Sequence, residues 1–310
     1  MRELVKGGHY TALKALYDGV ADPLSQLVRT AIIPEEGHKI LVADFSAIEA
    51  RVTAWFAGEE WKLQAFRDGQ DIYCATASQM FHVPVVKHGI NGELRQKGKV
   101  AELACGYGGG VNALKAFGAD KMGMTDEEMQ DVVDKWRDSN ANVAAWWKTM
   151  ENAAIRAVAR QVETVDKIGK IAFSFENGVL FMKLPSGRRL AYWGAAYGES
   201  RFQPGRKTLS YMGVNQQTKK WSRVETWGGK LVENAVQATA RDVLREAMFA
   251  LDEQGYQVIA HVHDECIVTE PIASGRTYED MAKTMCPDIP WAKGLPLEAA
   301  GYDGDYYFKD

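Results

Sequence analysis

The stretch Leu41-Val-Ala-Asp-Phe-Ser-Ala-Ile-Glu-Ala-Arg51 decides how the rest of this sequence is interpreted. Residues 40–43 are apolar and partly β-branched, which predicts a buried strand that ends at Asp44. A carboxylate in that position costs free energy to bury unless something pairs with it. Taken alone, an Asp here more often caps the helix that follows than binds a metal ion.

A second acidic segment lies far along the chain, in Val258-Ile-Ala-His-Val-His-Asp-Glu-Cys-Ile-Val268. Two apolar arms flank the polar residues His263-Asp264-Glu265, which predicts a β-hairpin whose turn carries the acids. Two strands that each present an Asp are able to hold hard divalent cations through oxygen ligands. Such an arrangement meets the needs of Mg²⁺-dependent phosphoryl transfer.

A third segment, residues 94–107, predicts a helix with one unusual face. Arg95, Lys99, Leu103 and Tyr107 follow one another at four-residue steps. They drift by only ~40° per step on an α-helix and therefore form a single stripe. Two cations, an apolar residue and an aromatic ring on one face suit a nucleoside triphosphate. The alternative is a solvated basic end that runs into a core stripe, with the glycines after Tyr107 ending the helix.

These three segments together resemble the motifs of family A DNA polymerases. Asp44-Phe-Ser-Ala-Ile-Glu-Ala-Arg51 resembles the first palm motif, usually Asp-Tyr-Ser-Gln-Ile-Glu-Leu-Arg, and His263-Asp264-Glu265 resembles the second. The segment from Arg95 to Gly108 resembles the fingers motif. The motifs occur in the family's order, and the resemblance covers essentially the whole chain, in the style of phage and prophage enzymes. It implies an α+β fold, in which a palm carries the acidic motifs on an antiparallel sheet beside a mostly helical fingers subdomain.

The same resemblance implies an order of subdomains along the chain. Residues 1–60 would form the first part of the palm, and residues 228–310 its second part. Residues 61–227 would form the fingers, with the nucleotide-binding helix at about 94–107 and a β-hairpin insert at about 170–193. Asn177-Gly178 inside this insert is a strong signal for a hairpin turn.

The resemblance implies template-directed DNA synthesis, in which a deoxynucleotidyl group passes from a dNTP to a primer 3′-hydroxyl. Asp44 and Asp264 would bridge two Mg²⁺ ions, and the carbonyl of Phe45 would add an oxygen ligand. Glu265 would stand behind these ligands as a further catalytic carboxylate. Lys99 would bind phosphate and protonate the pyrophosphate as it leaves.

The nucleotide site would take the remaining residues of the fingers stripe. Arg95 would bind the β- and γ-phosphates, and Tyr107 would stack near the templating base. Leu103 stands where the family usually has Phe or Tyr, so we expect altered discrimination at the 3′ position of the sugar. Glu49 would close off space at the 2′ carbon, and in relatives it bonds this Tyr. Tyr73 occupies a position that is usually His, where its hydroxyl is still able to donate to phosphate.

Five residues are expected to contact DNA on the same grounds. Asn234 and Gln237 match the family's palm helix, and such side chains reach the minor-groove acceptors that every correct base pair presents. His261 and His263 flank the second acidic motif, near the expected primer terminus. Arg51 closes the first motif.

Composition limits where nucleic acid is able to bind. The chain has 310 residues, of which 46% are hydrophobic and 25% charged, enough for a large core and two or more subdomains. Its net charge of −4 does not indicate nucleic-acid binding, so phosphate contacts must come from a local basic patch. Lys219, Lys220 and Arg223, interleaved with Trp221 and Trp227, form such a stretch. It would contact a template or primer backbone, or it is a solvated hairpin face.

Cysteine use and hydropathy indicate the cellular compartment. The four cysteines are scattered and include no Cys-x-x-Cys pair, which argues against a zinc module or a disulfide framework and fits a reducing cytosol. Residues 1–6 begin no long apolar run, and no stretch approaches the ~20 apolar residues of a membrane span. We therefore expect no membrane partner and a place in the cytoplasm of a bacterial or phage-infected cell.

Family members carry a thumb, and often a proofreading exonuclease, ahead of the palm. No Asp-x-Glu exonuclease signature precedes Asp44, and there is no room for a thumb. We expect a fragment, a degenerate remnant, or one half of a split polymerase that works with a thumb- or exonuclease-bearing polypeptide. The alternative function is a non-catalytic nucleic-acid-binding or assembly subunit that keeps the fold. A metal-dependent hydrolase is a third candidate, which the single Arg/Lys/Tyr face of residues 94–107 disfavours.

Overall fold

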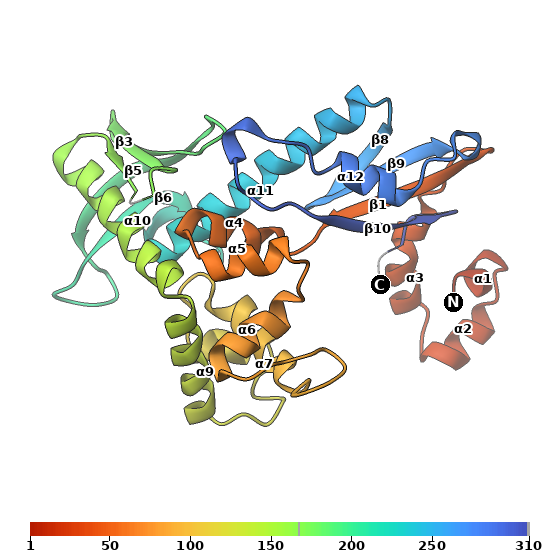
Figure 1. Ribbon diagram of the computed structural model, residues 1–310, viewed down its shortest axis with the longest axis horizontal. Coiled ribbons are helices and arrows are strands. Elements are labelled where there is room, and N and C mark those ends of the chain that lie inside the picture. Colours follow the sequence, from red (N-terminus) through yellow and green to blue (C-terminus); the bar gives the residue numbers. More distant parts are fainter. Residues whose placement is uncertain (167, 309–310) are drawn as a thin grey trace. The chain divides into compact units, whose positions relative to one another are not determined.

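The computed structural model describes residues 1–166 and 168–308 (Figure 1). The chain divides into two compact units. The first unit comprises Met1–Ser46, Val243–Asp288 and Leu297–Asp310, and the second comprises Ala47–Asp242 and Ile289–Pro296. The chain passes from the second unit into the first within a single helix, α11 (Gly228–Glu253).

A four-stranded antiparallel sheet lies at the centre of the first unit. Its strands are β10 (Ala299–Gly304), β1 (His38–Phe45), β9 (Glu265–Pro271) and β8 (Gln257–Val262), in that spatial order (Figure 1). Strand β1 is paired on both sides, so residues 40–43 are fully buried and read as one apolar run. The strand and the hairpin predicted around the two acidic motifs are therefore neighbours in one sheet.

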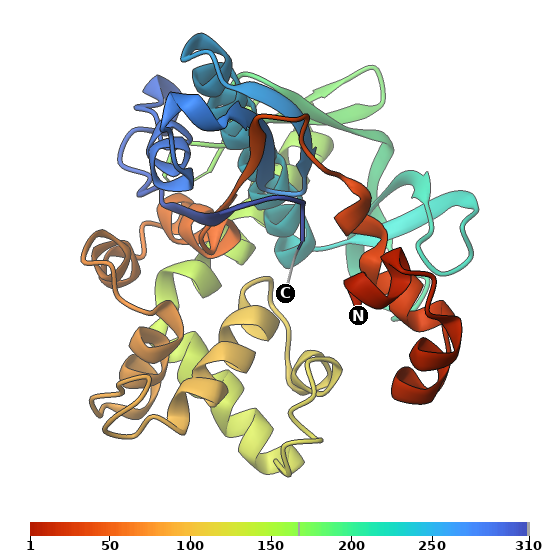
Figure 2. The ribbon, with the colours of Figure 1, turned by 90° about the vertical axis from the view of Figure 1, so that its right-hand side faces the viewer.

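Short helices complete the first unit. They are α1 (Arg2–Lys6), α2 (Tyr10–Tyr17), α3 (Ala21–Leu27) and α12 (Tyr278–Thr284), with 3₁₀ turns η1 (Val28–Ala31) and η2 (Ile272–Ser274). Helix α12 packs against β1 and β10. Helices α1 to α3 bury only Leu13 and Pro23. Figure 2 shows these N-terminal helices extending away from the strands of their own unit.

Helices build most of the second unit. They are α4 (Ile48–Ala57), α5 (Glu60–Arg67), α6 (Ile72–Phe81), α7 (Leu94–Cys105), α8 (Val111–Ala116), α9 (Asp126–Ser139), α10 (Ala141–Arg160) and the first part of α11, with the 3₁₀ turn η3 (Pro290–Ala292). The helix predicted over residues 94–107 is α7, which ends two residues before Tyr107. A capping box in which the Thr125 hydroxyl and the Glu128 carboxylate each bond the other's backbone N–H begins α9.

The second unit also contains an antiparallel sheet of its own. Its strands run in sequence order as β2 (Thr164–Val165), β3 (Ala172–Glu176), β4 (Val179–Lys183), β5 (Arg189–Glu199), β6 (Lys207–Val214) and β7 (Trp221–Thr226). The predicted turn Asn177-Gly178 joins β3 to β4, and both residues have the positive φ that a tight hairpin turn requires. The hairpin expected at about 170–193 is thus part of a larger sheet that continues to Thr226.

The predicted α+β class, with antiparallel strands carrying the acidic motifs and a largely helical second part, is confirmed. The subdomain boundaries at residues 60 and 228 stay a prediction, because the two compact units divide the chain by a different criterion. Among the described residues, every helix is too short or too polar to cross a lipid bilayer.

Candidate active site

The two acidic motifs meet on adjacent strands of the first unit. Asp44 is the penultimate residue of β1, and its Cα lies opposite that of Glu265 on β9. The Phe45 N–H donates to the carbonyl of Asp264 at 3.3 Å. Asp264 belongs to the two-residue turn between β8 and β9, where His263 adopts a left-handed conformation with φ of 55°. Sheet register therefore brings Asp44 and Asp264, more than 200 residues apart in sequence, to the same end of the sheet.

Glu265 differs from the two aspartates in its surroundings. Its side chain is only 3% exposed, and the hydroxyl of Tyr307 donates to its Oε1 at 2.5 Å. Burial, the hydrogen bond to Glu265 and the charge of Glu265 all raise the pKa of Tyr307. The Glu265 carboxylate is therefore buried and is held in place by the hydrogen bond from Tyr307. Sequence reasoning missed Tyr307, because nothing in the closing segment links it to a motif so distant in sequence.

The donor chemistry at this end of the sheet fits magnesium. Asp44 and Asp264 are half-buried carboxylates on neighbouring backbone segments, and Phe45, which follows Asp44 on β1, donates its N–H to the Asp264 carbonyl. In the part of the chain that the structure describes, no three His, Cys, Asp or Glu side chains gather as a complete metal cage. Mg²⁺ is commonly bound through one or two carboxylates, with water and substrate phosphates completing its shell. Two aspartates with a nearby carbonyl match that mode of binding.

Arg95 at the start of α7 is held by an aspartate on α6. Its Nε and Nη2 donate to Oδ2 of Asp71 at 2.9 and 2.7 Å. The other oxygen, Oδ1, accepts the backbone N–H groups of Tyr73 and Cys74, so Asp71 is also the N-cap of α6. Burial acts to raise the pKa of Asp71, but the bonds from Arg95 and the two amides outweigh it and lower that pKa.

Tyr73, Arg95 and Lys99 come together in the second unit. The Arg95 guanidinium lies 5.2 Å and the Lys99 ammonium 6.0 Å from the centroid of the Tyr73 ring. Gly98 makes this approach possible, because a Cβ at that position would lie 2.3 Å from the carbonyl oxygen of Tyr73. The two cations thus share one face with an aromatic hydroxyl, beside the tight α6–α7 contact.

The end of α7 is tied to α4 and α11. The Tyr107 hydroxyl donates to Glu49 Oε2 at 2.6 Å, the contact that the resemblance implies. Burial and the neighbouring Glu49 carboxylate raise the pKa of Tyr107 far above its usual value. A Cβ on Gly229 would lie 2.0 Å from the Tyr107 carbonyl oxygen, so α11 begins directly against this residue. Trp147 Nε1 donates to the carbonyl of Gly106 at 3.1 Å and fixes the same turn.

A buried ion pair lies on the other side of α7. Both carboxylate oxygens of Glu102 are 2.8 Å from Nζ of Lys62, and the two side chains are 7% and 2% exposed. Thr76 and Trp136 donate to the same carboxylate at 3.2 and 3.1 Å. Glu102 stands where the family motif usually has Asn. Through its bonds to Lys62, Thr76 and Trp136, Glu102 joins helices α5, α6, α7 and α9.

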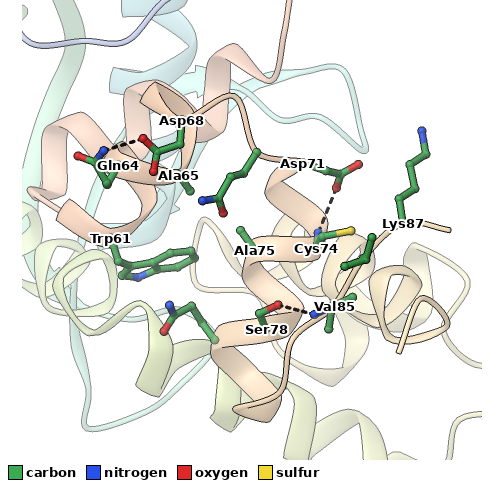
Figure 3. A pocket seen from close by; sticks show the side chains of 13 residues that line it. Trp61, Gln64, Ala65, Asp68, Asp71, Cys74, Ala75, Ser78, Val85 and Lys87 are labelled. Carbon is green, nitrogen blue, oxygen red and sulfur yellow. Dashed lines mark hydrogen bonds between the residues drawn. The ribbon is translucent and has the colours of Figure 1, made fainter. Parts of the chain in front are cut away.

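A pocket of about 600 Å³ opens between α5 and α6. Figure 3 shows Trp61 and Asp71 on its wall, with the dashed hydrogen bond from the Cys74 amide to Asp71. The pocket therefore adjoins the carboxylate that holds Arg95. Sequence reasoning did not anticipate it, because the lining comes from α5, α6 and the segment that follows α6.

The residues predicted on the palm helix have different surroundings. Asn234 donates through Nδ2 to the hydroxyl of Tyr192 on β5 at 3.1 Å, whereas Gln237 is exposed one turn later. Asp242 on the same helix is 5% exposed and accepts from Arg188 Nε at 2.8 Å. This pair, buried only on the Asp242 side, joins the turn before β5 to α11, and sequence reasoning missed it.

The remaining predicted DNA and nucleotide contacts divide by exposure. His261 and His263 are exposed at the β8–β9 hairpin of the first unit. Leu103 is 43% exposed on α7. Arg51 is only 4% exposed, with its guanidinium 4.3 Å from the centroid of Phe66. A side chain buried in this way packs the interior of the second unit, so the DNA contact expected of Arg51 is not carried further.

Comparison with known proteins connects this geometry to a family. Residues 19–170 match the family described as DNA polymerase family A. The chain is 49% identical, over 311 aligned residues, to a DNA polymerase of Bacillus phage SP02, an alignment that covers 100% of this chain and 47% of the phage protein. It is 26% identical over 285 residues to the thermostable DNA polymerase I of Thermus aquaticus, covering 90% of this chain and 28% of that protein.

The fold agrees with a solved polymerase domain. The structure described as the POL domain of Pol1 from M. smegmatis, in complex with DNA primer-template and dNTP, matches 91% of this chain and 42% of that one. The TM-score is 0.59 at 20% sequence identity, which shows a common fold. The chain spans about half the length of the phage relative and a smaller share of the bacterial ones.

Proposed function

We propose that this chain is the catalytic half of a family A DNA polymerase, which transfers a deoxynucleotidyl group from a dNTP to a primer 3′-hydroxyl under the direction of a template. The observation that carries the proposal is the juxtaposition of Asp44 and Asp264 on adjacent backbone segments of one sheet. The stripe of α7, with Arg95 and Lys99 beside Tyr73, supports it from the second unit.

In this proposal the first unit binds the metals. Asp44 and Asp264 would be their carboxylate ligands, and the Phe45 carbonyl would supply a further oxygen. Two bound Mg²⁺ ions would activate the primer hydroxyl and neutralise charge on the phosphates. Glu265, held by Tyr307, would fix the end of β9 and keep the neighbouring aspartate in place. His261 and His263, exposed at the hairpin, would approach the primer terminus.

The second unit would bind the nucleotide. Arg95 and Lys99 would bind its phosphates, and Asp71 orients the Arg95 guanidinium through two hydrogen bonds. Lys99 would also protonate the leaving pyrophosphate. Leu103 and Tyr107 would lie against sugar and base. Glu49, already bonded to Tyr107, would limit the space at the sugar's 2′ carbon.

Primer-template DNA would be the macromolecular partner. Gln237 is exposed on α11 and would reach the minor groove, whereas Asn234 would exchange its bond to Tyr192 for one to DNA. Since the chain spans about half of the phage relative, a second polypeptide that carries the thumb, and in some cases an exonuclease, would strengthen the grip on the duplex. We also propose a cytoplasmic location in a bacterial or phage-infected cell, which the phage relative supports and the free cysteines fit.

Primer extension tests this proposal directly. A labelled primer-template is incubated with the chain, Mg²⁺ and all four dNTPs, beside Asp264→Asn and the control Asp252→Asn, whose carboxylate is exposed near the end of α11. We expect extension by the native chain and the control, with a loss of at least a hundredfold in Asp264→Asn. Equal extension by both variants would remove Asp264 from the catalytic centre.

If the native chain extends no primer, a second experiment is needed. Addition of a polypeptide that matches the remaining part of the phage relative should then start synthesis. No primer extension with or without the added polypeptide would instead favour the alternative of a non-catalytic nucleic-acid-binding or assembly subunit.

A further inference from the structure

The sheet of the second unit has one covered and one open face. Phe173, Met182 and Tyr192 are buried on the covered face, and α10 packs against strands β2 to β5 (Figure 1). On the opposite face, Trp193 is 57% and Trp221 is 61% exposed. Two tryptophans of this exposure on the solvent face of one sheet are costly for a surface with no ligand.

Strand register places these rings beside a fixed cation. Trp193 pairs with Met212, Met212 pairs with Arg223, and the next residue pair on this face is Val214 with Trp221. Cross-strand partners share a face, so both rings and the guanidinium lie together. Arg223 Nη1 donates to the carbonyl of Gly194 at 3.0 Å and to Ser210 Oγ at 3.1 Å. Its planar group is therefore held on the sheet between the strands that carry the tryptophans.

The open face also carries an aromatic ring and cations where β4 pairs with β5. Phe181 lies on it opposite Ala191, and the Arg189 guanidinium is 4.0 Å from the centroid of the Phe181 ring. Lys183 is opposite Arg189 on the same face. Aromatic rings and cations thus alternate across four strands.

Charge around this face is unlike that of the whole molecule. Residues 181–227 contain nine Lys and Arg but only two Glu, in a chain whose net charge is −4. Two of the nine, Arg188 and Arg189, pair with Asp242 and Glu176 from outside this stretch, so the cations still outnumber the carboxylates around them. Of the two Glu residues, Glu225 is engaged by Ser200 Oγ at 2.9 Å and by the Arg201 N–H. This stretch is therefore a positive island on an acidic protein, which identifies a negatively charged occupant.

A pocket at the free edge of the sheet adds a second observation. It measures about 470 Å³ beside β7, and its lining includes Phe202, Arg206, Arg223 and Trp227. Phe202 and Trp227 are 80% and 52% exposed. A cavity of this size with two rings and two guanidinium groups accommodates a flat, anion-bearing group such as a nucleotide. The match to DNA polymerase family A ends at residue 170, before β3.

We propose that the open face of strands β4 to β7, with the pocket beside β7, binds single-stranded DNA. Unpaired bases would stack on Trp193 and Trp221, and the surrounding cations would contact the phosphates. Duplex DNA hides its base faces, so it would use the cations but not the rings. An acidic protein partner would likewise use the cations without needing two flat, exposed indoles. The inference goes beyond the proposed polymerase activity, because that activity assigns no metal, dNTP or duplex contact to the residues of this face.

The test measures the affinity of the full chain for a fluorescein-labelled oligo(dT), by anisotropy, without Mg²⁺ or dNTP. The double variant Trp193→Ala/Trp221→Ala should bind about a hundredfold more weakly, since one stacked base contributes roughly tenfold or more. The control is Phe249→Ala, which removes a ring of equal exposure, 57%, from α11. Unchanged affinity in the double variant, or an equal loss in the control, would overturn the proposal.

A second variant covers the case in which the tryptophan changes disturb the sheet. Lys219→Gln/Lys220→Gln removes two exposed charges from the turn between β6 and β7. It should reduce the slope of log affinity against log salt by about 1.4, whereas Lys283→Gln on α12 should leave it unchanged. An unchanged slope, or a native chain that binds no oligo(dT) at low salt, would refute single-strand binding and leave an acidic protein as the occupant.

Discussion

Asp71 combines two structural roles in a single carboxylate. One oxygen caps α6 through two backbone amides, and the other holds the guanidinium of Arg95. The family resemblance directs attention to Arg95 and to Tyr73, but the geometry shows that Asp71 fixes the first and begins the helix of the second. Its lowered pKa records this balance, because the hydrogen bonds outweigh the cost of burial.

The variant Asp71→Asn separates the two roles, because Asn is as good an N-cap as Asp but carries no charge. A carboxyl group with a lowered folded-state pKa stabilises the fold above its unfolded pKa of about 4, and this contribution is lost as the pH falls through the folded value. We therefore expect Asp71→Asn to unfold about 2 °C below the native chain at pH 7. The difference should narrow as the pH falls from about 4 to about 3. Thermal unfolding at both pH values checks this.

The matched control for this prediction is Asp68→Asn, since Asp68 is exposed near the same pocket and accepts only from Gln64, at 2.8 Å, in the described contacts. It should change the unfolding temperature little at either pH. A deficit in Asp71→Asn that persists unchanged at pH 3 would show that shape rather than charge is responsible.

Glu102 illustrates a residue whose departure from a motif has a structural reason. Replacement by Gln would leave the Lys62 ammonium, 2% exposed, without a neutralising charge. We expect Glu102→Gln to lower the free energy of unfolding by about 3 kcal/mol. The surface variant Asp131→Asn, which removes the partner of Lys135, should cost under ~1 kcal/mol. Urea denaturation of the two variants compares them, and equal losses would show that burial of this pair has no special cost.

At the scale of elements, the contact between α6 and α7 decides where the fingers cations lie. Gly98 lies in the interior of α7, where Ala would normally stabilise a helix by about 1 kcal/mol. Here the added Cβ would meet the carbonyl oxygen of Tyr73 at 2.3 Å and Ala77 at 3.0 Å. The Tyr73 oxygen belongs to the backbone and Ala77 is buried, so neither is able to move aside easily.

Gly98→Ala should therefore destabilise the chain by about 1–3 kcal/mol, against the direction of helix propensity. Gly106→Ala is the control, because its Cβ would lie an ordinary 3.5 Å from its nearest neighbour, the Glu102 carbonyl oxygen. Urea denaturation should show a loss only for Gly98→Ala. Stabilisation of both variants would mean that α6 and α7 separate at little cost.

Sequence patterns predicted the elements better than the contacts between them. The strand before Asp44, the hairpin at Asp264 and the stripe on α7 follow from periodicity and spacing, which are local properties. The contacts of Asp71 with Arg95 and of Tyr307 with Glu265 depend on side chains brought together by packing. Arg51 shows the converse, since its place in a motif concealed its burial against Phe66. The second sheet also continues beyond the hairpin expected at about 170–193, through β6 and β7 to Thr226.

At the scale of the whole molecule, charge and apolar surface are unevenly distributed. The basic residues gather between 181 and 227, whereas the N-terminal helices expose large apolar side chains. These are Tyr10, Leu16, Tyr17, Leu24, Val28 and Ile33, between 39% and 70% exposed. Exposed apolar side chains that gather on one segment are a candidate surface for a protein contact. The chain spans 47% of the length of the phage relative.

We therefore expect a polypeptide that corresponds to the remaining part of the phage relative to dock on the N-terminal helices. Its addition should tighten binding of primer-template DNA at least tenfold, because it adds backbone contacts on the duplex. The variant Tyr10→Ser/Leu16→Ser/Val28→Ser should lose this gain, whereas its affinity for oligo(dT) should stay at the native value, since the single-strand surface lies in the other unit. Anisotropy with both DNA probes measures the two effects in parallel. A gain that survives the triple variant would place the docking surface elsewhere, and a simultaneous loss of oligo(dT) binding would indicate misfolding of the chain rather than loss of a partner.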